Sequence, residues 1–193
     1  MADVWANLYP WETQPMTRKS SFALTILFTF AGMALAQDAN MPGPSPEHKK
    51  LAYFAGTWKS EAAMKPMGQF PGGKTTSVDR VEIMPGGFFT VTHSDGSGPM
   101  GPLHEMEVMG YDVKEKVYTY DGFNNFGEHE TYKGTFDGDT WTWTGDSDFG
   151  GHAMKGRFVV KVVSAAAYTF RFDFSPDGTA WTNIMEGKAT KAE

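Results

Sequence analysis

The sequence predicts an all-β protein, with about ten antiparallel strands in a meander that closes into a barrel after one short helix. The 193 residues include 15 Phe, 7 Tyr, 6 Trp and 22 Gly, a composition that favours pleated, half-buried surfaces and tight turns. From Gly56 onward apolar and polar residues alternate with the period of a strand. Short turn signals such as PGG, FDGD and SPDG separate the alternating segments, so sequential strands are expected to pair.

The first part of the chain has the layout of a secretory signal peptide, which we place at residues 16–36. Arg18 and Lys19 precede an apolar run over 22–36 that ends in the small-x-small tripeptide Ala-Leu-Ala. That run has 15 residues and is shorter than the ~20 that a membrane-spanning helix needs. We therefore expect cleavage after Ala36, no membrane anchor afterwards, and a periplasmic or secreted protein.

The residues on either side of this segment do not belong to the predicted barrel. Residues 1–15 contain two Trp and two Pro and are unlike a signal-peptide start, so we interpret them as a non-native extension from a mis-assigned start, with translation beginning at Met16. Residues 37–45 form a polar linker with Pro and Gly. The barrel domain is expected over 46–193.

A short helix should open the domain. Ser45 can cap it, Pro46 suits its first position, and Glu47 complements the positive end of the helix dipole. Gly56 can end it. Strands are then predicted over 56–65, 74–84, 87–94, 103–112, 116–123, 128–136, 140–146, 153–163, 167–174 and 180–188.

A barrel of ten strands is wide enough to hold a cavity, and aromatic rows are its candidate lining. In YTFRFDF the aromatic residues share one face, and in TWTWTG two tryptophans oppose the threonines. Periodicity alone does not decide which rows face the lumen, and these side chains can equally fill the barrel. The candidate lining residues are Trp58, Tyr118, Tyr120, Trp141, Trp143, Phe170, Phe172 and Phe174.

Arg80 and His93 are the candidate polar anchors of a ligand. They lie in strands flanking the MPGG turn and can approach each other across it, where the pair would orient a carboxylate or enolate. The alternative is a surface pair on the outer wall, because Arg is rarely buried.

Composition and motifs exclude several other functions. The net charge is −6 without a basic block, which argues against nucleic-acid binding. The absence of Cys excludes disulfides and thiolate metal sites. No two of the five His have a metal-binding spacing, and no catalytic motif is present, so no cofactor, metal or catalytic residue is assigned.

The leading hypothesis is an exported barrel that binds a small hydrophobic or amphipathic molecule in its lumen. The alternative is a barrel enzyme of the isomerase or hydrolase type, in which His93 or Glu105 is the general base.

Five segments together resemble the bacterial domain-of-unknown-function family 1579: PEHKKLAYFAGTWKSEAAMKP, MGYDVKEKVYTYDGF, ETYKGTFDGDTWTWTGD, MKGRF and FSPDGTAWTNIMEGKATK. This resemblance covers about 46–191 and implies a calycin-like (lipocalin-like) fold, a short helix followed by an antiparallel barrel. It implies no activity.

A more distant resemblance is to nitrobindin-type haem barrels, which begin Gly-x-Trp-x-Gly-x-Gly. Gly56 and Trp58 match, whereas Ser60 and Ala62 replace the later glycines. Those proteins take their iron ligand from a His in the closing strand, and the last predicted strand here has none. The haem-binding alternative is therefore disfavoured, and His152 is a poorly placed substitute.

Overall fold

A computed structural model describes residues 42–68, 70–149 and 151–192. The predicted extension over 1–15, the signal peptide over 16–36 and most of the linker over 37–45 lie outside the described residues.

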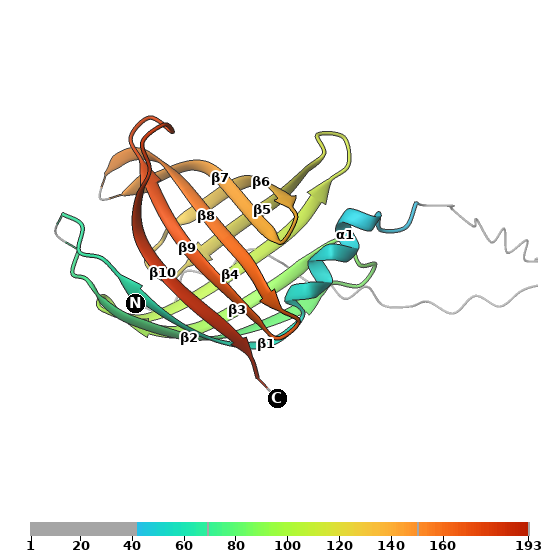
Figure 1. Cartoon of the computed structure of the whole chain (residues 1–193), viewed down its shortest axis with the longest axis horizontal. Helices are drawn as coiled ribbons and strands as arrows, with labels where there is room; N and C mark the ends of the chain where they lie inside the picture. The colour runs from blue at the N-terminus through green and yellow to red at the C-terminus, as the bar shows by residue number, and fades with distance from the viewer. Residues whose placement is uncertain (1–41, 69, 150, 193) are drawn as a thin grey trace, which may run out of the picture. The chain divides into compact units, whose positions relative to one another are not determined.

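Ten strands form a closed antiparallel barrel, as predicted (Figure 1). Each strand pairs with its neighbours in sequence, and pairing of β1 with β10 closes the wall, from Trp58 opposite Lys191 to Met64 opposite Met185. The strands are β1 (Gly56–Met64), β2 (Gly73–Ile83), β3 (Thr90–Gly98), β4 (Gly101–Asp112), β5 (Val117–Asn124), β6 (His129–Asp137), β7 (Thr140–Phe149), β8 (His152–Ser164), β9 (Ala167–Ser175) and β10 (Thr182–Lys191).

The predicted helix is present at one end of the barrel, but it changes form partway (Figure 1). The α-helix α1 (Pro46–Lys50) continues as the 3₁₀-helix η1 (Leu51–Phe54). At its start the Ser45 backbone N–H donates to Nδ1 of His48 (3.1 Å). The His48 ring packs edge-on against Phe88 and Tyr111, so the helix is held against the β2–β3 turn and β4. Among the described residues no helix is long and apolar enough to cross a membrane.

Buried side chains join this helix to the first strand. Leu51, Phe54 and Trp58 are all buried, and the indole N–H of Trp58 donates to the Phe54 carbonyl over 2.7 Å. Gly56 lies between Phe54 and Trp58 with φ of +117°, a conformation that residues other than glycine rarely adopt. The segment α1–η1 therefore forms a plug that closes one end of the barrel.

The strands β3 and β4 are longer than predicted. The glycine-rich DGSGPMG segment lies between the strands predicted over 87–94 and 103–112, yet β3 continues to Gly98 and β4 begins at Gly101. A Cβ on Gly96 would lie 2.6 Å from the Thr76 carbonyl oxygen, and one on Gly98 would lie 2.9 Å from Thr75 Cγ2. These glycines are strand residues in a place where the neighbouring strand leaves no room for a side chain.

Cross-strand register determines which residues face inward. Trp58 on β1 is fully buried and lies opposite Asp79 on β2. Asp79 in turn lies opposite Ser94 on β3, and Ser94 lies opposite Glu105 on β4. Residues directly opposite in a sheet share a face. Asp79, Ser94 and Glu105 therefore face the inside of the barrel.

We predict that Gly134→Ala destabilises the barrel by about 1–3 kcal/mol, the usual cost of overpacking a core. Gly134 lies opposite the buried Trp143, and an added Cβ would lie 2.5 Å from its Cδ1 and 2.6 Å from the Thr142 carbonyl oxygen. Urea denaturation would measure the loss, with Gly43→Ala as control because its Cβ would meet nothing within 4 Å. Equal stability of the two variants would contradict this packing.

Candidate functional site

The plugged end of the barrel is filled with aromatic side chains. Tyr118, Trp141 and Trp143 are buried there beside Phe54 and Trp58. The Trp141 and Trp143 rings stack at 5.5 Å, and Trp141 also lies 5.4 Å from the Phe54 ring. These predicted lining residues therefore pack against one another and against the plug.

The predicted row on β9 extends from this packed region toward the other end. Phe170 and Phe172 are half-buried, whereas Phe174 is buried. Phe158 of β8 lies opposite Phe172 with the ring centroids 6.4 Å apart. Phe158 and Phe172 face inward and are only half-buried, so they form an apolar wall of the interior.

Tyr120 lies at the boundary of the two regions. It is buried, and its ring stacks on Tyr132 at 5.6 Å and approaches Phe158 at 6.3 Å. Its hydroxyl donates to Oε1 of Glu107 over 2.9 Å. Tyr120 thus joins the aromatic region to a carboxylate.

The structure corrects the expected position of Arg80 and His93. They lie opposite each other on β2 and β3, as predicted, but on the outer face, because the neighbouring Asp79 and Ser94 face inward. The Arg80 side chain is 57% exposed and its Nη1 donates to Oδ2 of Asp95 over 2.8 Å. The two residues are a surface pair and do not line the lumen.

Four inward-facing carboxylates, which we call the acidic lumen, occupy the half of the barrel away from the plug. Only Glu105 among them was predicted from the sequence, as a candidate general base. Ser60 donates to Asp79 over 2.8 Å, and Ser147 donates to Glu130 over 3.1 Å. The inward positions of this half carry no Lys or Arg among the described residues. The acidic lumen consists of Asp79, Glu105, Glu107 and Glu130.

Burial raises the pKa of three of these carboxyl groups, those of Glu105, Glu107 and Glu130. It raises the pKa of Glu105 well above its usual value, and the charges of Glu107 and Glu130 raise it further. Burial also raises the pKa of Glu107 to about 7, against the opposing hydrogen bond from Tyr120. The pKa of Glu130 is raised for the same reason. A low-dielectric environment without a nearby cation favours the neutral acid.

The remaining histidines contribute little to this arrangement. His93, His104 and His129 are exposed on the outer face, and His152 is exposed at the start of β8. Among the described residues no group of three or more His, Asp or Glu has the geometry of a metal site.

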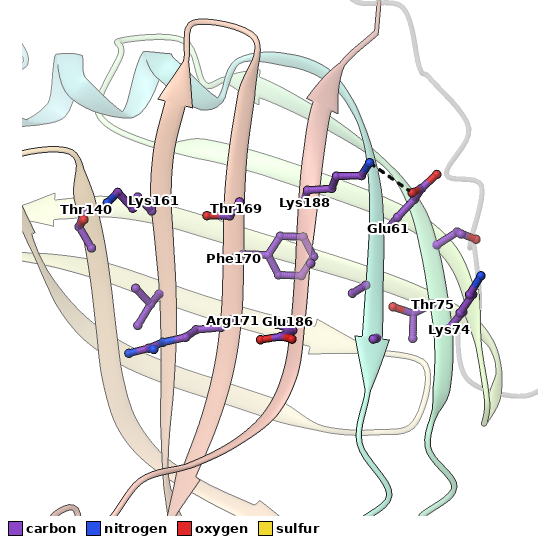
Figure 2. A pocket seen from close by; sticks show the side chains of 15 residues that line it. Glu61, Lys74, Thr75, Thr140, Lys161, Thr169, Phe170, Arg171, Glu186 and Lys188 are labelled. Carbon is purple, nitrogen blue, oxygen red and sulfur yellow. Dashed lines mark ion pairs between the residues drawn. The ribbon is translucent and has the colours of Figure 1, made fainter.

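A separate groove runs over the outer face from β7 to β2 and is lined by charges of both signs (Figure 2). Lys188 and Glu61 approach to 3.8 Å across it, with both side chains largely exposed. Exposed pairs of this kind are worth little and are screened by salt. Charges in this groove therefore attract a charged group less strongly than buried carboxylates would.

We predict that Glu107→Gln stabilises the protein at pH 8 by on the order of 2–3 kcal/mol. Unfolded, Glu107 loses its proton near pH 4.5, whereas folded it keeps the proton to about pH 7. The wild type therefore loses stability as pH rises through this window and does not regain it above pH 7. Urea denaturation should show that Glu107→Gln increases the free energy of unfolding more at pH 8 than at pH 5. The control Glu82→Gln, at an exposed position, should show no such difference. An equal gain at both pH values would contradict the raised pKa.

Comparison with one solved structure supports the fold, and a second structure is more distantly similar. Rv2717c from M. tuberculosis is similar at 10% identity and a TM-score of 0.54, with 78% of this chain and 99% of that chain covered. EF1p2_mFAP2b bound to DFHBI is similar at 9% identity and a TM-score of 0.43, with 75% and 98% covered. No curated protein matches significantly. The family model described as "Protein of unknown function (DUF1579)" matches residues 43–191, and the chain therefore belongs to this family.

Proposed function

We propose that this protein binds a small amphipathic molecule in the half of the lumen away from the plug. The observation that carries the proposal is that one half of the interior holds both an apolar wall and carboxylates that can accept hydrogen bonds. Phe158 and Phe172 offer the wall, and Glu105 and Glu107 offer the acceptors. Ligand sites are typically apolar cavities with a few precisely placed polar groups.

Tyr120 and Tyr132 support this reading because they connect the two surfaces. Their stacked rings continue the apolar wall, with Tyr132 6.3 Å from Phe172. Their hydroxyls lie near carboxylates, Tyr120 at Glu107 and Tyr132 within 3.5 Å of Ser147, which itself donates to Glu130. The two tyrosine rings therefore connect the apolar wall on β8 and β9 with the carboxylates on β4 and β6 across the interior.

A second function, general acid–base catalysis, is favoured by Glu107. Its pKa of about 7 and its hydrogen bond to Tyr120 suit a group that exchanges protons near neutral pH. Conversion of a co-purified ligand by the wild type but not by Glu107→Gln would favour the enzyme over the binding protein.

The proposal includes export, which rests on the sequence alone. Arg18 and Lys19, the apolar run and the Ala-Leu-Ala tripeptide have the order of a cleaved signal peptide. A ligand-binding barrel in the periplasm would meet molecules that enter from outside the cell.

We predict that blocking the lumen abolishes ligand binding. Ser77 faces inward between Ser60 and Gly96 and is half-buried, so Ser77→Trp would occupy the open space. Prodan, a neutral polarity-sensitive dye, should bind the wild type saturably and lose at least tenfold in affinity to this variant. Thr76→Trp is the matched control, because Thr76 is exposed on the outer face of the same strand. A folded Ser77→Trp variant, checked by circular dichroism, that binds prodan normally would refute binding in the lumen.

We predict that the full chain is processed on export. Expressed in a Gram-negative host, it should appear in the periplasmic fraction with Gln37 as its first residue, as mass spectrometry would show. Ala36→Arg should leave the precursor uncleaved, because the cleavage site requires small residues. A chain that starts at Gln37 should stay in the cytoplasm as control. An unprocessed cytoplasmic wild type would contradict export.

A further inference from the structure

Glu105 differs from the other members of the acidic lumen because no hydrogen bond reaches its carboxylate from any described residue. Its cross-strand neighbours are Ser94 on β3 and Asn124 on β5. Protein atoms enclose the side chain, and the surface that it keeps faces the lumen. A buried polar group without a partner costs stability, and an unpaired buried charge costs more.

The other three carboxylates are only partly satisfied. Asp79, Glu107 and Glu130 accept hydrogen bonds from a serine or tyrosine hydroxyl, and such neutral donors leave the negative charges uncompensated. The nearest basic residue on β2, Arg80, faces outward and pairs with Asp95. The described protein therefore supplies no cation to this space.

We propose that the amphipathic ligand carries a cationic amine, which Glu105 and Glu107 hold while its apolar part lies along Phe158 and Phe172. The inference rests on the proposed function and names the class of its ligand. An ammonium group would pair with the unpartnered Glu105 carboxylate and relieve the repulsion between neighbouring acids.

Other head groups fit the same space less well. A carboxylate or phosphate would add a negative charge to a space that already holds four acids. A neutral alcohol can donate one hydrogen bond but leaves the charges unpaired. A metal ion lacks a suitable ligand geometry among the described residues.

Amine binding should depend on pH because every charged group facing Glu105 is acidic. These groups are Asp79 from β2, Glu107 from β4, Glu130 from β6 and Glu128 beside it, with the neutral side chains of Ser94 and Asn124 alongside. Above about pH 7 Glu107 is ionised and attracts the ammonium, whereas below it the proton competes. A primary amine itself stays charged up to about pH 10. Affinity should therefore rise from pH 5.5 to pH 8, with protons released on binding.

The test compares two probes of equal shape, 2-phenylethylamine and 2-phenylethanol, by calorimetry and by displacement of prodan. At pH 8 the amine should bind the wild type at least tenfold more tightly than the alcohol. Glu105→Gln should weaken amine binding roughly tenfold to hundredfold, as expected for the loss of a hydrogen bond to a charged group, and leave the alcohol unchanged. The exposed control Glu82→Gln should bind both as the wild type does.

The outcomes separate this inference from the proposed function. If prodan binds in the lumen but amine and alcohol bind equally, or the preference survives both Glu105→Gln and Glu107→Gln, the amine inference is overturned while lumen binding stands. If neither prodan nor the amine binds the wild type, both proposals are overturned. Retained prodan binding shows that each variant is folded.

Discussion

The hydrogen bond from the Trp58 indole to the Phe54 carbonyl fixes the closed end of the barrel. It satisfies two polar groups that are buried from water, at 2.7 Å, and it connects the end of the plug to the first strand. Separating them would leave both groups unpaired, at a cost of about 1–3 kcal/mol each. The plug therefore packs as part of the core, against the aromatic side chains around it.

Because the plug closes only one end, the two halves of the interior differ in chemistry. Near the plug most of the buried side chains are aromatic, and the indole N–H groups of Trp141 and Trp143 have no hydrogen-bond partner among the described residues. Beyond Tyr120 the inward positions include the four carboxylates of the acidic lumen. The hydroxyl of Tyr120 is the point at which the aromatic packing ends and the hydrogen-bonded carboxylates begin. One barrel thus combines aromatic packing at one end with hydrogen-bonded carboxylates at the other.

The sequence predicts the strands well because alternation is a local property, but the inward face depends on register. On β2 the segment TTSVDRVEI carries polar residues on both faces, so alternation does not select one. Its pairing with β1 places Asp79 opposite Trp58 and turns Arg80 outward. On β4 the faces of LHEMEVMGY hold apolar residues equally, which concealed the inward position of Glu107. On β7 the alternation separates Trp141 and Trp143 from the threonines of the opposite face, although periodicity alone left open which face points inward.

The acidic lumen lowers the stability of the folded protein. Burial of several like charges without a basic partner favours the neutral acids, and residues of similar shape without charge would cost less. The hydroxyls of Ser60, Tyr120 and Ser147 orient three of the carboxylates without neutralising them, and Glu105 has no hydrogen-bond donor among the described residues. Carboxylates that are held in place but lack a positively charged partner suit a preorganised binding site. A cation can pair with them without a rearrangement of the barrel wall.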